Sequence, residues 1–178
     1  MNLINYLYCS SGREKKYSKF FLILFAVFSL PLLCQSQKND NITTLNSKAN
    51  NYIIEGKLDS AITILNQIKD ISKNTGDSLN EIKTLSTLAE VYQQKDSLDK
   101  ALTFIDQAKI LAHSYFETEQ VTEFADIFQY YGAIQMEKRN MEEAKRSLFK
   151  SVNIRKSLSS DSDTLLAYAY NKLGTYYW

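Results

Sequence analysis

Residues 85–108 read LSTLAEVYQQKDSLDKALTFIDQA, and this segment carries two runs of apolar side chains. The first run consists of Leu85, Leu88, Ala89 and Tyr92, and the second of Ala101, Leu102, Ile105 and Ala108. Both runs recur every three or four residues, which is the period of an amphipathic helix. Because the polar pair Asp96-Ser97 separates them, the segment is predicted to form two antiparallel helices joined by a tight turn.

The same arrangement recurs along the chain with a period of just over forty residues. Small residues stand at intervals of 40, 43 and 42 residues, at Ala49, Ala89, Gly132 and Gly174. All but the last are followed twelve residues later by an alanine, at Ala61, Ala101 and Ala144. A small residue is expected where two helices cross closely, since a large side chain would hold the backbones apart. The period therefore predicts an all-α solenoid of antiparallel helical hairpins, about three and a half repeats long.

Turn and capping residues mark the expected helix ends. Gly56-Lys57 and Arg139-Asn140 are predicted to be the turns of the first and third hairpins, and Gly76 is predicted to end a helix in the left-handed conformation. Capping boxes are predicted from Ser78 to Glu81 and from Asn140 to Glu143. These signals divide the array into repeats at 43–76, 77–116 and 117–160, with a partial repeat at 161–178.

These patterns resemble the tetratricopeptide repeat, whose first helix has a bulky residue, a leucine followed by a small residue, and a tyrosine. The first-helix match lies at Leu85, Leu88-Ala89 and Tyr92 and again at Tyr170, Leu173-Gly174 and Tyr177, and the second-helix match at Ala101, Ile105 and Ala108. The first and third repeats depart from the pattern at Lys48, Ile68, Tyr131, Gln135 and Ser151. The long period is similar to the kinesin-light-chain-like variant and to arrays that precede bacterial sensor histidine kinases and helix-turn-helix regulators. The resemblance implies a non-enzymatic protein-interaction module.

Residues 1–36 are predicted to be a signal peptide. Basic residues from Arg13 to Lys19 precede the apolar run Phe20–Leu33, which is shorter than the roughly 20 residues that span a bilayer. Cleavage is expected after Ser36, which would leave a polar leader at 37–42 and the repeat array at 43–178. The mature protein would then be periplasmic or secreted and would contact the membrane only before cleavage. The alternative is a membrane anchor formed by Phe20–Leu33.

Composition argues against several classes of function. Residues 37–178 hold 17 basic and 19 acidic side chains, which gives no electrostatic reason to expect nucleic-acid binding. Both cysteines lie in the predicted signal peptide, and His113 is the single histidine, so no metal site, cofactor or catalytic residue is expected. Glu142 and Glu143 are expected to be a charged helix start. One helix is expected to carry a solvated basic face made of Lys145, Arg146, Lys150, Arg155 and Lys156.

The functional surface of such an array is expected in the concave groove lined by the first helix of each hairpin. The register places these residues there: Asn46, Asn50, Lys83, Ser86, Glu90, Gln93, Asp126, Gln129, Met136 and Glu137. The aromatic residues Tyr170, Tyr177 and Trp178 form a second candidate surface, an exposed terminal helix for a partner or for self-association. Two functions stay open. One is an exported module that binds a peptide or partner helix through either surface, and the other is the extracytoplasmic sensor portion of a truncated signalling protein.

Overall fold

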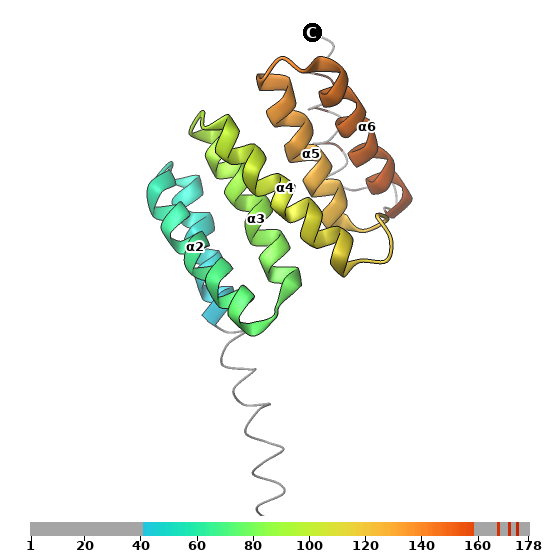
Figure 1. The fold of residues 1–178 in the computed structure, drawn as a ribbon. Coiled ribbons are helices and arrows are strands. Elements are labelled where there is room, and N and C mark those ends of the chain that lie inside the picture. The colour runs from blue at the N-terminus through green and yellow to red at the C-terminus, as the bar shows by residue number, and fades with distance from the viewer. Residues whose placement is uncertain (1–40, 159–166, 168–170, 172–173, 175–178) are drawn as a thin grey trace, which may run out of the picture. The chain divides into compact units, whose positions relative to one another are not determined.

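The computed structural model describes residues 41–158, 167, 171 and 174. The chain divides into two compact units, Met1–Thr43 and Thr44–Trp178, and the hairpins lie in the second. Residues 41–54 are helical and are followed by α2 (Leu58–Thr75), α3 (Ser78–Gln94), α4 (Leu98–Tyr115), α5 (Thr122–Glu137) and α6 (Met141–Leu158) (Figure 1). Helix is the only regular structure of the described residues, and the all-α solenoid of hairpins is confirmed. The predicted signal peptide and the terminal residues Tyr170, Tyr177 and Trp178 lie outside the described residues.

Three tight turns of one form close the hairpins. In each turn one residue has a left-handed φ, which is 71° at Gly56, 57° at Asp96 and 64° at Arg139. The N–H of the next residue donates to the carbonyl five residues earlier, over 2.8 Å for Lys57 and 2.9 Å for Ser97 and Asn140. This bond belongs to the Schellman motif, which satisfies carbonyls left free at a helix end. The three predicted turns are therefore confirmed.

The connection from α2 to α3 takes only two residues. Gly76 ends α2 with a φ of 71°, as predicted, and the N–H of Asp77 donates to Ser72 O over 2.9 Å. The capping box predicted to begin at Ser78 is wrong by one residue. Asp77 is the N-cap of α3, and its carboxylate accepts the backbone N–H of Asn80 over 3.1 Å.

The second predicted capping box, from Asn140 to Glu143, is also wrong. The side-chain amide of Asn140 donates to Gln135 Oε1 over 2.7 Å, and Glu143 pairs with Arg146 one turn further along α6. Glu143 still lies in the first turn of α6, where a negative charge is favourable with the helix dipole.

The small residues occupy the helix crossings of the hairpins, as predicted. The alanines Ala49, Ala61, Ala89, Ala101 and Ala144 are fully buried. A Cβ atom added to Gly132 would lie 2.8 Å from Leu148 Cγ and 3.1 Å from Ala144 O. Since real Cβ atoms do not approach side chains this closely, α5 and α6 cross at a distance that admits only glycine at this position. Gly174, the fourth small residue of the series, is helical and exposed.

The unequal repeat spacing of 40 and 43 residues arises in one connection. Residues 76–77 join α2 to α3, whereas residues 116–121 join α4 to α5. The longer connection adds four residues and α5 is one residue shorter than α3. Each helix packs on its neighbours in sequence, and α3 also contacts α5 directly. This last contact brings together the first helices of the second and third hairpins.

Candidate functional site

The helices α3 and α5 form the two walls of a groove that has two adjoining parts. The first part, which we name the glutamate cleft, has a volume of about 190 Å³ and is lined by Glu90, Gln93 and Gln94 of α3 and by Gln129, Tyr130, Ala133 and Glu137 of α5. The second part, the lysine cleft, has a volume of about 180 Å³ and is lined by Ile82, Lys83, Ser86 and Thr87 of α3 and by Glu123, Asp126 and Tyr130 of α5. Tyr130 lines both parts, so they follow one another along the groove.

Seven of the ten residues predicted for the groove line these clefts. They are Lys83, Ser86, Glu90, Gln93, Asp126, Gln129 and Glu137. The other three line neither cleft: Asn46 and Met136 are half-buried, and Asn50 is exposed. The structure thus brings together the groove residues of the second and third hairpins. Their role in binding stays a prediction.

Hydrogen bonds between the two walls fix the geometry of the glutamate cleft. The Gln93 side-chain amide donates to Glu137 Oε1 over 2.7 Å, and the Tyr130 hydroxyl donates to Glu90 Oε2 over 3.0 Å. Each bond joins α3 to α5, and in each the donor is uncharged. The two carboxylates therefore lie on opposite walls of the cleft, and each accepts a hydrogen bond from the other wall.

Opposite charges meet in the lysine cleft. Lys83 Nζ lies 3.4 Å from Glu123 Oε1, again across the two walls. Arg155 of α6 forms an ion pair with Asp126 and is itself 2% exposed. Burial raises the pKa of the Asp126 carboxyl above its ordinary 3.8, while the charge of Arg155 acts in the opposite direction.

The burial of Arg155 corrects the prediction of a fully solvated basic face on α6. Arg146 and Lys156 are exposed, and Lys145 and Lys150 are half-buried, but Arg155 is one of the core residues. The repeat register carries the signal for this. Arg155 follows Ala144 by eleven residues, and the residues at the same distance from Ala61 and Ala101 are Ser72 and Ala112, both fully buried.

Arg155 also orients the base of the glutamate cleft. Its Nη2 lies 3.5 Å from Oε1 of Gln129, whose side chain is almost completely buried. The amide oxygen of Gln129 therefore faces Arg155. The Gln129 side chain also lines the cleft. Sequence reasoning placed Gln129 in the groove but gave no indication of the arginine behind it.

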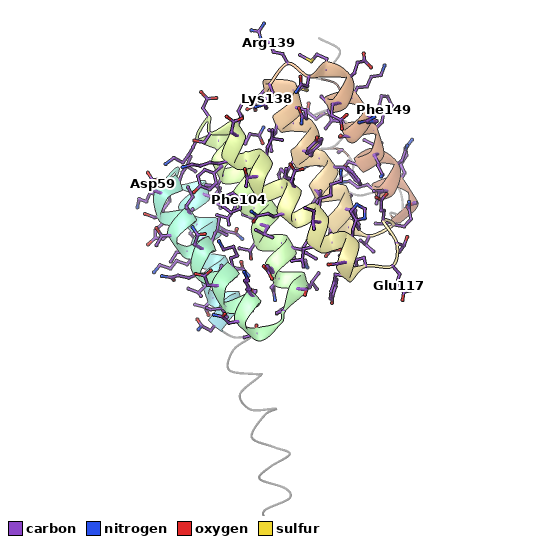
Figure 2. The ribbon with its side chains drawn as sticks, in the orientation of Figure 1. Asp59, Phe104, Glu117, Lys138, Arg139 and Phe149 are labelled. Atoms are coloured by element: carbon purple, nitrogen blue, oxygen red, sulfur yellow. The ribbon has the colours of Figure 1, made fainter. Side chains whose placement is uncertain are left out.

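Two further ion pairs tie each hairpin to the next at the turns. Lys95 pairs with Asp59, and Lys138 Nζ lies 2.6 Å from Asp99 Oδ1. In both pairs the lysine directly precedes the left-handed turn residue, and the aspartate lies in the first turn of the preceding hairpin's second helix. Figure 2 shows Lys138 beside Arg139 at the turn after α5. The hydrogen bond and charge of Lys138 lower the pKa of Asp99 below its ordinary 3.8.

The single histidine lies away from both clefts. His113 is exposed, its Nε2 lies 3.6 Å from Glu119 Oε1, and its ring centroid lies 4.8 Å from that of Phe124. Within residues 41–158, 167, 171 and 174, no three histidine, cysteine or acidic side chains are arranged to hold a metal ion. A search of the same residues for a helix with the length and apolarity to cross a membrane also finds none.

Comparison with known proteins shows which repeat family part of the chain is similar to. Residues 40–109 match the family model described as the tetratricopeptide repeat. BtubC (BKLC) from P. vanneervenii superposes with a TM-score of 0.65 at 18% identity, over 76% of this chain and 55% of that one. A Podosopora anserina putative kinesin light chain with nearly identical TPR-like repeats superposes with a TM-score of 0.66 at 16% identity, over 77% of this chain and 65% of that one. The chain thus spans less than two thirds of these structures, and the likeness shows the fold. A search of curated proteins found no match.

Proposed function

We propose, from the match of residues 40–109 to the tetratricopeptide repeat, that the chain is an exported protein–protein interaction module whose partner binds in the groove between α3 and α5. The fold is that of a protein-interaction module, and such repeats are typically non-catalytic scaffolds, which supports binding rather than turnover. The observation that carries the proposal is the pair of adjoining clefts, which are lined from both walls by polar side chains.

The size of the clefts favours a polypeptide over a small-molecule cofactor. Sites for drug-sized ligands commonly have volumes of about 300–1,000 Å³. Each cleft is smaller than this, at about 190 and 180 Å³, and the two follow one another along the helices. Successive side chains of one extended peptide, or of one face of a helix, would fill such a row.

A photocrosslinking experiment tests the groove. A benzoylphenylalanine is introduced at Gln94, an exposed residue that lines the glutamate cleft, in cells that produce the full chain. The matched control is Gln107, an equally exposed glutamine on α4 that lines neither cleft. We expect a discrete partner adduct from position 94 that is absent at position 107. Adducts at both positions, or at neither, would count against the groove as the binding surface.

The intact mass of the native protein tests export and the sensor alternative together. A mass that corresponds to residues 37–178 supports secretion after cleavage at Ser36, and one that includes residues 1–36 supports the anchor at Phe20–Leu33. A much larger mass supports the sensor portion of a signalling protein. The resemblance to arrays that precede bacterial sensor kinases is what favours this second candidate.

The terminal aromatic residues remain a second proposed surface. Replacing Tyr177 and Trp178 with aspartate is expected to reduce self-association in sedimentation experiments, because an apolar segment that another copy covers would become charged. An unchanged oligomeric state would remove this surface from the proposal.

A further inference from the structure

We propose that the connection at residues 116–121 is a pH-dependent clamp that closes when His113 is protonated. This connection joins α4 to α5 and is the longest link between the helices of residues 41–158. The carboxylate of Glu119 lies within it and is shared between two helices. Glu119 Oε1 lies 3.6 Å from Nε2 of His113 on α4, and Glu119 Oε2 lies 2.5 Å from Nζ of Lys150 on α6.

The two contacts of Glu119 respond differently to pH. A lysine ammonium is charged throughout the range from about pH 5 to 8, whereas an imidazole gains its charge within that range. A separation of 3.6 Å is too long for a hydrogen bond from a neutral imidazole, so the contact with His113 depends on charge. Glu119 therefore ties the connection to α6 at all these pH values, and to α4 only when His113 is protonated.

The place of His113 in α4 adds a second effect of the same sign. His113 lies in the last turn of α4, where the free carbonyl groups carry a partial negative charge. An imidazolium is favourable at this helix end as well as opposite the Glu119 carboxylate. Protonation should therefore stabilise the end of α4 and the connection that follows it, and this gain is lost as the pH rises.

The surroundings of the imidazole allow it to change its charge. Its side chain is 48% exposed, so water can exchange protons with it. From α5 it meets the ring of Phe124, with the ring centroids 4.8 Å apart, and from the connection it meets Glu119, which Lys150 of α6 also reaches. Lys109, one turn earlier on α4, lies over two aromatic rings of α5. Glu119 is thus the acid that a protonated imidazole faces.

The clamp acts next to the wall of the groove. The helix α5 begins directly after the connection, and Glu123 and Asp126 in its first two turns line the lysine cleft. The Ser157 hydroxyl of α6 donates to Gln120 Oε1 over 2.6 Å, which is a tie between neutral groups and does not depend on pH. Protonation of the imidazole adds the tie to α4, so it should steady the end of α5 that carries these two acids.

Amide hydrogen exchange of the full chain, followed by NMR at pH 5.5 and pH 7.5 and corrected for the intrinsic exchange rates, tests the clamp. The N–H groups of Phe116 and Ala125 donate to backbone carbonyls at the two ends of the connection. We expect both to be about two- to threefold better protected at pH 5.5, which is the effect of an exposed ion pair. The amide of Ser97, in the turn that Lys95 ties to Asp59 without a histidine, is the internal control and should not change.

Three variants separate the parts of the clamp. His113→Gln keeps a polar side chain but removes the change of charge, so protection should no longer depend on pH. Glu119→Gln leaves the helix-end effect in place, so the dependence should be reduced and not abolished. Glu117→Gln removes an exposed carboxylate of the same connection that forms no ion pair with the described residues, and it should leave the dependence unchanged (Figure 2).

The outcomes are distinct from those that test the groove, since no ligand takes part. Equal protection at the two pH values in the unaltered chain would overturn the clamp. A pH dependence that persists in His113→Gln, or that Ser97 shares, would overturn it as well, because another group would then be responsible. A dependence of full size in Glu119→Gln would assign the effect to the helix end alone and remove the connection from it.

Discussion

The second and third hairpins share one backbone frame but fill it differently. In the second, the crossing of α3 and α4 is made by Ala89 and Ala101, and Ala112 closes the far end of α4. In the third, Gly132 replaces the first alanine and Arg155 stands where Ala112 does. The crossing residues are twelve residues apart in both hairpins. The same spacing thus accommodates an apolar core in the second hairpin and a buried cation in the third.

The difference has a consequence for the groove. The buried residues of α4 (Ala101, Ile105, Ala108 and Ala112) are all apolar, whereas Arg155 reaches from α6 to Asp126 and Gln129 on α5. The third hairpin therefore connects its core to the wall of the groove through polar contacts. Four changes would break or sharpen this contrast, and they follow in order of decreasing expected effect.

An arginine at the corresponding position of the second hairpin should have the largest effect on the free energy of unfolding. Ala112→Arg would bury a cation in an apolar cluster, and Lys83 occupies the position on α3 that corresponds to Asp126 on α5. The free energy of unfolding in urea, followed by circular dichroism, should fall by about 4 kcal/mol. Gln107→Arg, on the exposed side of the same helix, should change it by less than about 0.5 kcal/mol. Equal effects at the two positions would contradict the buried-charge argument.

Substitution of the glycine at the crossing of α5 and α6 should have the next largest effect on the free energy of unfolding. Gly132→Ala adds a Cβ atom that meets the Leu148 side chain and the carbonyl of Ala144. Overpacking of this kind costs about 1–3 kcal/mol, against a gain of about 1 kcal/mol in helix propensity, so we expect a net loss of about 1 kcal/mol in urea unfolding. Adding Leu148→Ala should relieve the clash and make the two changes non-additive. A stabilised Gly132→Ala variant would show that α5 and α6 do not cross this closely.

The turn residues should give changes in the free energy of unfolding that are of similar or smaller size and of the opposite sign. Arg139→Gly should raise the free energy of unfolding by about 1 kcal/mol, because a left-handed φ strains residues that carry a Cβ atom. Asp96→Gly should gain less, about 0.5 kcal/mol, since aspartate tolerates this conformation better than arginine does. Thermal melts of the two variants provide the comparison, and a larger gain at Asp96 would contradict it.

The ion pair at the third turn should give the smallest effect, and it should depend on pH. The folded pKa of Asp99 is lowered by Lys138, so the pair stabilises the fold above the ordinary pKa of 3.8. That contribution is lost as the pH falls through the folded pKa. Lys138→Met should therefore reduce stability slightly at pH 7 and not at pH 2, as measured by urea unfolding. A difference of the same size at both pH values would assign the effect to packing.

Helix period, turn positions and the small residues at crossings could all be predicted from the sequence, because each depends on contacts within one hairpin. Prediction failed where the type of a residue suggested exposure but its position in the repeat is a core position. Because arginine is rarely buried, Arg155 was predicted to be exposed, although its alignment with the other repeats indicates a core position. The N-cap of α3 was predicted one residue too late. Asp77, Ser78 and Asn80 are all residue types that suit a helix cap, and only the geometry distinguishes them.

The connection at residues 116–121 has a further consequence for how such a chain can change. The longer repeat gains four residues in this connection and loses one from α5. Glu119 secures the connection through an ion pair with Lys150, and its carboxylate also lies 3.6 Å from His113 Nε2. Because α3 contacts α5 directly, we expect the two clefts to keep their form when this loop is lengthened. A reporter sequence or an additional binding motif could be grafted into it without rephasing the groove, which makes the connection the natural entry point for engineering the array.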